Sequence, residues 1–313
     1  MGEGVHVFDV AVRVLNTATG DDKVKQTLDA YEALKRGELE LPDVDAPSHV
    51  GASASRQGHR ARPDVLPPDV PARDPNLEYV EPLLIPKRGK CGTAQSRIAH
   101  LHALVHIEAC AVDLAWDIIA RFGQHEEYRD VLPADFYRDF VIVAADEARH
   151  YAALKARLEE LGGKYGDIVV HDGLWDSARR TKDRLEARLA VEHATHEARG
   201  LDVLPATISK FEKSGDAQTA ALLSEVILPE EISHCAAGIK WIKYLYALGG
   251  NAAYQGRTWA KDACEYDKVE CWFHALVRGH YYGFLKPPFN KAAREEAGFS
   301  EEWYIPLMDA ADG

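Results

Sequence analysis

The stretch "DEARHYAALK", residues 146–155, decides how this chain of 313 residues is interpreted. It carries Glu147 and His150 within a run of small and aliphatic residues, and residues three apart lie over the same turn of an α-helix. The two polar residues fill a gap in an apolar stripe with steps of three and four. That stripe consists of Phe136, Phe140, Val143, Leu154, Leu158 and Leu161. The pattern therefore predicts a carboxylate and an imidazole on the buried face of one helix.

Three other predicted helices repeat this feature. Glu108 lies mid-way along the apolar face of the segment 96–123, and Glu197 does so in a helix expected at about 176–202. Glu231 and His234 share the apolar face of a helix expected at about 216–247. One buried carboxylate without compensation costs several kcal/mol, so four of them require positive charge nearby. Two divalent cations carry four positive charges, and neutral imidazoles add nitrogen ligands.

The order of these residues along the chain also repeats. Glu147 follows Glu108 by 39 residues, and Glu231 follows Glu197 by 34. Two α-helical hairpins, each with one Glu and one Glu-x-x-His, form the ligand arrangement of ferritin-like dimetal proteins. The sequence therefore predicts an all-α, ferritin-like four-helix bundle. A third Glu-x-x-His match, Glu3 to His6, fits no part of the pattern and is attributed to chance. The alternative interpretation is a buried, hydrogen-bonded polar layer without metal.

We expect one compact domain built from three segments. Residues 1–90 would form an N-terminal helical part, with Gly37 as a helix stop, followed by a proline-containing extended segment that wraps the core. Residues 91–285 would form the bundle, including a later helix at about 261–280, and residues 286–313 a C-terminal wrap. "HDGLW", residues 171–175, is interpreted as a linker turn. The expected apolar anchors of the N-terminal wrap are Val65, Leu66, Val70, Leu77, Leu83 and Leu84.

Composition excludes several classes of protein. A formal net charge of −13 and a pI near 5.5 argue against a broad basic surface for nucleic acid. The N-terminus lacks the pattern of a signal peptide or a myristoylation signal, and no run of about 18 apolar residues predicts a membrane span. The five cysteines form no Cys-x-x-Cys pair, which favours a reducing, cytoplasmic location and argues against thiol catalysis.

Six stretches together resemble a known family: "HALVHIEACAVDLAWD", "DEARHYAALKARLEELGGKYGD", "HDGLW", "HEARGLDV", "EEISHCAAGIKWI" and "LKPPFNKAAREEAGF". The family is ferritin-like and is catalogued as domain of unknown function four-five-five. The resemblance to this family covers nearly the whole chain. The family is in turn distantly similar to diiron hydroxylases that modify isopentenylated adenosine in tRNA. It implies the metal ligands Glu108, Glu147, His150, Glu197, Glu231 and His234. It implies no substrate. Pro229 is a local oddity, because a kink there would blur the choice between Glu231 and Glu230.

Carboxylate and imidazole ligands favour two iron ions, with manganese or a mixed pair as alternatives, over structural zinc. We expect Glu147 and Glu231 to bridge the ions, Glu108 and Glu197 to be terminal ligands, and each histidine to bind one ion. With O2 as co-substrate, such a centre would make the protein an oxidase, oxygenase or hydroxylase of an unidentified small organic molecule. An external electron donor could serve it.

Two alternatives remain open at this stage. The first is a tRNA-modifying hydroxylase, which would need a local basic patch. Its candidate residues are Arg56, Arg60, Arg62, Lys87, Arg88 and Lys90. The second is a metal-handling protein of the ferroxidase type without an organic substrate, although the long wraps fit a storage cage poorly.

Further polar residues could support the metal site. A ligating histidine needs an acceptor for its second ring nitrogen. The candidate acceptors are Asp113, Asp117, Asp146 and Asp202, with Arg149 and Arg199 as partners of such acids. His193 and His196 are candidates for extra ligands or substrate contacts, against a plain core or surface role. Lys286 and Asn290 would line a substrate entrance if the C-terminal wrap lay near the metals.

Overall fold

The computed structural model describes residues 5–42 and 65–308. Within these residues the regular structure is almost entirely helical, which confirms the predicted all-α helical bundle class. Strands are limited there to β1 (Val5–His6) and β2 (Leu39–Glu40), which pair in parallel, and to a bridge between Tyr79 and Val170. No helix in the described part of the chain is both long and apolar enough to cross a membrane.

The contacts divide the chain into two compact units. Unit 1 comprises residues 1–79, 103–156 and 164–170, and unit 2 comprises residues 80–102, 157–163 and 171–313. The three segments expected from the sequence stay a prediction. Each unit is described by itself.

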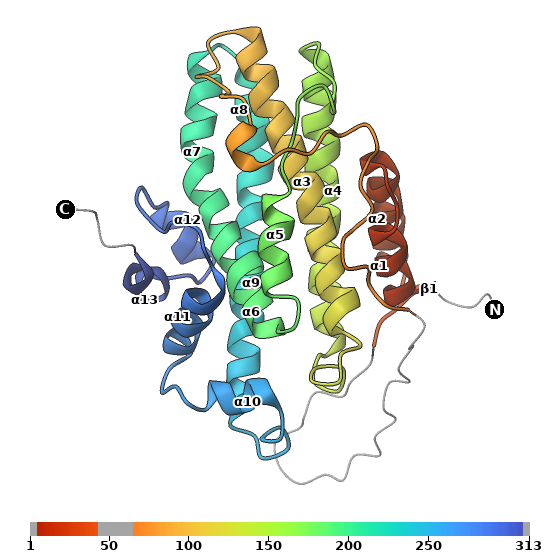
Figure 1. Cartoon of the computed structure of the whole chain (residues 1–313), viewed down its shortest axis with the longest axis vertical. Helices are drawn as coiled ribbons and strands as arrows, with labels where there is room; N and C mark the ends of the chain where they lie inside the picture. Colours follow the sequence, from red (N-terminus) through yellow and green to blue (C-terminus); the bar gives the residue numbers. More distant parts are fainter. Residues whose placement is uncertain (1–4, 43–64, 309–313) are drawn as a thin grey trace. The chain divides into compact units, whose positions relative to one another are not determined.

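Unit 1 begins with the helix pair α1 (Val7–Leu15) and α2 (Gly20–Lys35), which pack side by side (Figure 1). Thr19 caps α2, because its side chain accepts a hydrogen bond from the amide of Asp22. Gly37 follows the end of α2 with a φ of 70°, a left-handed conformation that glycine adopts at little cost. The predicted N-terminal helices and the glycine stop are therefore confirmed.

The long helices α3 (Ala94–Phe122) and α4 (Ala134–Glu160) contribute most of their length to unit 1. Gly123 directly follows α3, and Pro133 directly precedes α4. Proline suits the start of a helix because the first amides have no partner within the helix. Gly162 follows α4 with a φ of 83°. The bounds of both helices agree closely with the prediction, because these residues mark three of the four helix ends.

Residues 65–79 lie along unit 1, but their apolar side chains are poor anchors. The main chain accepts hydrogen bonds from Arg121 at Pro68 and from Gln124 at Val65, and Ala72 donates one to Leu15. The anchor prediction was wrong for four side chains, which are exposed. These are Leu66, Val70, Leu83 and Leu84. The wrap is held by main-chain polar groups, which an apolar count cannot reveal.

In unit 2 the predicted helix at 176–202 is wrong at both ends. A separate helix, α5 (Gly173–Arg180), precedes a continuous run of α6 (Leu185–Ala190), the π-helix η2 (Val191–His196) and α7 (Glu197–Lys213). Arg188 holds the break between α5 and α6, because its guanidinium donates to the hydroxyl of Thr181 and to the carbonyl of Ala178. "HDGLW" is therefore a turn only at residues 171–172, since Gly173 starts α5.

A second continuous run in unit 2 consists of α8 (Ala217–Ala221), the π-helix η3 (Leu222–Ile227) and α9 (Leu228–Gly249). Helix α9 packs against α6, η2 and α7 (Figure 1). Gly238 permits this packing, because a Cβ atom there would overlap the carbonyl of His193. Pro229 does not end the helix, since α9 continues for a further 20 residues, to Gly249.

The remainder of unit 2 consists of short elements. These are η1 (Pro82–Leu84), α10 (Thr258–Ala263), α11 (Val269–His280), α12 (Lys291–Glu296), α13 (Glu301–Tyr304) and η4 (Ile305–Leu307). The helix expected at 261–280 is thus two helices. The segment 281–290 between α11 and α12 has no regular structure.

Candidate metal centre

Unit 1 brings together three of the six predicted ligands, here called triad 1: Glu108 from α3, and Glu147 and His150 from α4. One ligand atom of each lies within 4.8 Å of the others. Nδ1 of His150 is 3.6 Å from Glu108 Oε2 and 3.5 Å from Glu147 Oε2. All three residues are buried, with at most 4% of any of them exposed. The regular helical period explains the arrangement, because Glu147 and His150 lie over one turn of α4.

The charges of triad 1 call for a cation. Burial raises the pKa of Glu108 well above its usual range, and the charge of Glu147 adds to the rise. Burial acts to lower the pKa of His150, but its contacts with Glu108 and Glu147 outweigh burial and raise it to about 11. The two carboxylates therefore favour a positive charge between them. A proton on His150 supplies one charge, and a divalent ion supplies two.

Unit 2 brings together the other three predicted ligands, here called triad 2: Glu197 from α7, and Glu231 and His234 from α9. Their ligand atoms also lie within 4.8 Å of one another, and Nδ1 of His234 is 3.7 Å from Glu231 Oε2. Glu231 and His234 are buried, whereas Glu197 is partly exposed. Triad 2 contains the same residue types as triad 1, but it is more exposed to solvent because of Glu197.

Both helical runs of triad 2 change period just before their ligands. The π-helix η2 ends at His196, directly before Glu197, and the π-helix η3 ends at Ile227, four residues before Glu231. A π-helical turn holds one more residue than an α-helical turn and is frequent at functional sites. Neither π-helical turn could be predicted from the sequence, since the apolar positions around them still fit a helical stripe.

Both triads fit a transition-metal ion. Oxygen and nitrogen ligands lie about 2.0–2.2 Å from such an ion, so donors that share one ion lie about 3–4 Å apart. The separations within each triad are of this size before any adjustment to an ion. Two carboxylates and one imidazole suit iron or manganese, while a closed structural zinc site would need four ligands, often thiolates.

The four predicted supporting acids each bind a basic side chain. Asp113 accepts from Lys23 and Arg73, Asp117 from Arg121, and Asp146 from Arg149. Asp202 accepts from Arg199 at 2.9 Å and from the fully buried Arg294 at 2.6 Å. The expected pairing of Arg149 and Arg199 with such acids is confirmed.

His193 and His196 both lie in η2, but neither belongs to a metal-capable group among the described residues. Nε2 of His196 lies 3.2 Å from the hydroxyl of Ser177 and 3.7 Å from a carboxylate oxygen of Glu192. Glu192 is 1% exposed, and neither of its carboxylate oxygens accepts a hydrogen bond. The sequence interpretation missed Glu192, whose spacing of five residues from Glu197 matches a π-helical turn rather than an α-helical one.

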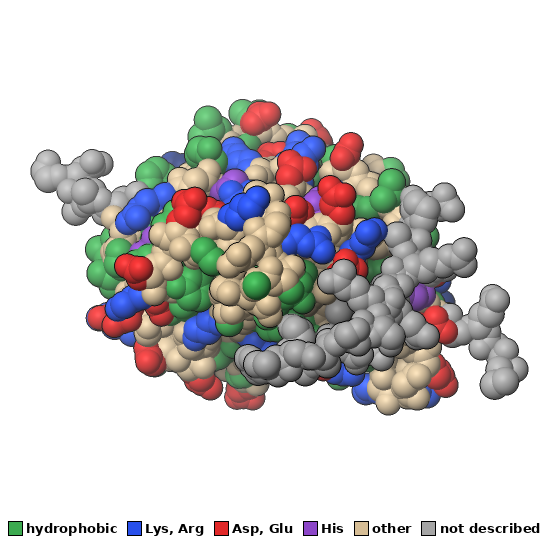
Figure 2. Space-filling model, turned by 90° about the horizontal axis from the view of Figure 1, so that it is seen from below, with side chains coloured by type: hydrophobic (Ala, Val, Ile, Leu, Met, Phe, Trp, Pro, Cys, Tyr) green, Lys and Arg blue, Asp and Glu red, His purple; other side chains and the backbone are tan. Residues whose placement is uncertain are grey.

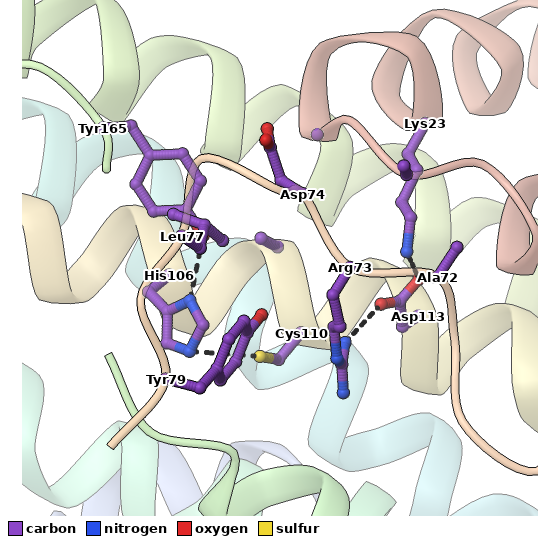
Figure 3. Close-up of a pocket in the computed structure, with 13 residues that line it drawn as sticks. Lys23, Ala72, Arg73, Asp74, Leu77, Tyr79, His106, Cys110, Asp113 and Tyr165 are labelled. Atoms are coloured by element: carbon purple, nitrogen blue, oxygen red, sulfur yellow. Dashed lines mark hydrogen bonds and ion pairs between the residues drawn. The ribbon is translucent and has the colours of Figure 1, made fainter. Parts of the chain in front are cut away.

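The outer face of α3 borders a separate small cavity in unit 1, of about 30 Å³, which is room for one water molecule (Figure 3). His106 lies between the hydroxyl of Tyr165, at 2.9 Å, and the thiol of Cys110, at 3.8 Å. Lys23 and Arg73 hold Asp113 at its other end. Burial raises the pKa of Asp113, and the two cations oppose that rise. The cavity is too small for an organic substrate.

Surface charge gives the expected basic patch little support. Lys87, Arg88 and Lys90 are exposed neighbours in unit 2, whereas Arg56, Arg60 and Arg62 lie outside the described residues. On the face drawn in Figure 2, acidic and basic side chains are interspersed, so that face offers no broad cationic surface.

Fold and site together define an all-α helical bundle protein with Glu and His groups that can hold metal ions. The family model described as "Protein of unknown function (DUF455)" matches residues 16–305. The chain belongs to this family. An uncharacterized protein of Haemophilus influenzae is 31% identical over 240 residues, which span 76% of this chain and 77% of that protein. No solved structure matches the chain.

Proposed function

We propose that the six predicted ligands hold two metal ions and that the protein is a non-haem dimetal oxidase or oxygenase, with iron as its metal. The observation that carries this proposal is the duplicate triad. Each unit places two carboxylates and one imidazole within reach of one ion. Four carboxylates balance the charge of two divalent cations, and the ligand order repeats along the chain as in ferritin-like dimetal proteins.

The residues have distinct roles in this proposal. His150 and His234 would each offer one ring nitrogen to a metal ion, and Glu108, Glu147, Glu197 and Glu231 would offer carboxylate oxygens. Burial of triad 1 keeps bulk water away from its three ligands. A bound iron pair supplies the reduction of O2 that is coupled to oxidation of an organic substrate, with electrons from that substrate or an external donor.

The state of the cysteines agrees with a reducing compartment, in which iron(II) chemistry is possible. The cysteines are free thiols, and three of them are buried. We expect the protein to work in the reducing cytoplasm, where iron(II) and free thiols both persist.

Oxygen uptake tests the proposed function. Protein loaded anaerobically with two equivalents of iron(II) should consume O2 well above the rate of the same iron in buffer. Glu147→Ala should reduce uptake to that background, whereas Glu212→Gln, at an exposed carboxylate on α7, should leave it unchanged. Uptake no faster than free iron, or equal uptake in the two variants, would contradict the proposal.

A second observation supports an oxygenase rather than a protein that only handles metal. An oxygenase needs a cavity near its metals for an organic substrate. Unit 2 contains a cavity of about 210 Å³, large enough for a small organic molecule.

A further inference from the structure

The segment 281–290 follows the helical turns around Glu197 within unit 2. The rings of Tyr281 and His196 meet edge to face with centroids 5.3 Å apart. Arg199 donates to the carbonyl of Lys286 at 3.2 Å, and the Asn290 side chain donates to the carbonyl of Leu201 at the same distance. The segment therefore contacts α7 and η2 on both sides of Glu197 in the sequence, which is the partly exposed ligand of triad 2.

One side of this segment lines the cavity of about 210 Å³. Alternate residues of an extended chain point to opposite sides. Tyr281, Gly283 and Leu285 line the cavity, whereas Tyr282 and Phe284 are 72% and 71% exposed. The remaining wall is formed by Val277, Arg278 and Leu307.

Tyr281 belongs to both features, since it lines the cavity and touches His196. Its ring folds back over Gly283, where a Cβ atom would overlap the phenol oxygen. His196 is the fixed partner of this contact, because Ser177 and Glu192 flank its Nε2. The Tyr281 side chain therefore lies between the cavity lining and the helical turn that ends at His196, directly before Glu197.

The charge of the cavity indicates which ligands it accepts. Arg278 is the charged residue of the lining, which contains no carboxylate. Its guanidinium donates to the carbonyl of Pro306 at 2.8 Å, which leaves other N–H groups of the fork for a ligand. Most of the accessible surface of the wall is polar, which suits a small, polar organic acid.

We propose that this cavity is the port through which a small organic anion reaches Glu197, with Tyr281 as its gate and Arg278 as its anion-binding group. The inference rests on the proposed function for its purpose, because it names the substrate class of that site. Arg278 binds the anionic group outside the metals, and the gate admits the remainder of the molecule. Neither role requires a metal to be bound, so both can be tested on protein treated with a chelator.

Binding of benzoate, compared with its uncharged analogue benzamide, tests the anion site. We expect full-length, chelator-treated protein to bind benzoate at least about tenfold more tightly than benzamide by calorimetric titration. Arg278→Met should remove this preference. Arg180→Met is the matched control, because Arg180 lies over the outward-facing ring of Tyr282, and it should change the affinity less than about twofold. Equal binding of the two probes, or equal effects of the two variants, would overturn the anion site.

Labelling of a thiol introduced by Glu197→Cys tests the route and the gate. The rate of modification by a sulfonate-bearing methanethiosulfonate is followed at that peptide by mass spectrometry. Added Tyr281→Ala should raise the rate at least about tenfold, and Arg278→Met should lower it for this reagent but not for the uncharged methyl reagent. Tyr282→Ala should have no effect. Unchanged rates in Tyr281→Ala would overturn the gate.

Each result is decisive by itself. If Glu197→Cys does not fold, Gly283→Ala in the chain with Glu197 intact displaces Tyr281 and should change benzoate affinity at least about threefold. An unchanged affinity would then overturn the gate. A protein that binds no metal but passes these tests would refute the proposed function and leave the port standing.

Discussion

The two triads consist of the same three residue types, yet the chain builds them differently. Triad 1 stands on the regular helices α3 and α4, and its residues are all buried. Triad 2 stands on runs interrupted by the π-helices η2 and η3, and its Glu197 is partly exposed. Chemical duplication therefore coexists with structural asymmetry. The ligands of triad 1 are therefore closed off from solvent, whereas triad 2 has one ligand that solvent can reach.

The largest expected effect concerns the close packing behind triad 2. Gly238→Ala should lower the free energy of unfolding by about 3 kcal/mol, because the new Cβ would overlap the main chain at His193, which cannot move aside cheaply. Urea unfolding of the metal-free protein measures this change.

Gly200→Ala in α7 is the matched control, since nothing lies within 4 Å of a Cβ there. It should leave stability unchanged or raise it by up to about 1 kcal/mol. A loss in Gly238→Ala no larger than the change in Gly200→Ala would mean that α9 does not depend on this contact.

A smaller effect is expected for Glu108→Gln, whose change in the free energy of unfolding should have opposite signs without and with bound metal. Without metal, Glu108→Gln should raise the free energy of unfolding by about 1–2 kcal/mol, because it removes one of two buried carboxylates that disfavour each other. With saturating manganese(II) or iron(II) the same variant should be less stable than the natural protein, since it loses a ligand.

Glu197→Gln gives the comparison from triad 2. Because Glu197 is partly exposed, its metal-free stability should change by less than about 0.5 kcal/mol. Thermal unfolding with chelator and with metal checks both variants. Equal metal-free effects at the two positions would refute the distinction between a closed and an open triad.

The smallest expected effect is a pH dependence at the start of the run that carries Glu231. Asp216 caps α8 through the amide of Thr219 and pairs with Arg157 at 2.9 Å. Burial acts to raise the pKa of Asp216, but the hydrogen bonds from Thr219 and Arg157 outweigh burial and lower it. The stabilisation is therefore present above the unfolded carboxyl pKa of about 3.9 and is lost as pH falls through the lower folded value.

Asp216→Asn keeps a capping side chain but loses the ion pair with Arg157, so it should cost about 0.5–1 kcal/mol at pH 7 and much less near pH 3, as measured by unfolding across that range. The exposed Asp22, at the start of α2 in unit 1, supplies the control. Asp22→Asn should cost less than about 0.5 kcal/mol at any pH. A cost for Asp216→Asn that did not fall with pH would mean that its charge is unimportant.

The sequence predicted the ligands of both triads, because each of them falls on an apolar stripe with a helical period. Along α3 and α4 that period is unbroken, so the bounds of these two helices could be predicted as well. The π-helical turns η2 and η3 shift the faces of the following residues without breaking the apolar pattern. The placement of Glu192, five residues before Glu197, therefore could not be predicted.

The other features that the sequence did not predict have one cause in common. They depend on long-range polar contacts, which produce no local pattern in the sequence. The break at 181–184 is held by Arg188, and the chain at 65–79 is held by donors such as Arg121 and Gln124. The proposed role of Tyr281 depends on its contact with His196, which lies 85 residues earlier in the chain. Such a contact cannot be predicted from the local sequence.

The central claim is that the two triads hold one pair of metal ions. Anomalous diffraction at the iron edge, from crystals of the iron-loaded protein, tests this most directly. The account predicts two peaks about 3.5–4 Å apart, one bound by Glu108 and His150 and the other by Glu197 and His234. A single peak, peaks bound by other residues, or no peak after iron loading would contradict it.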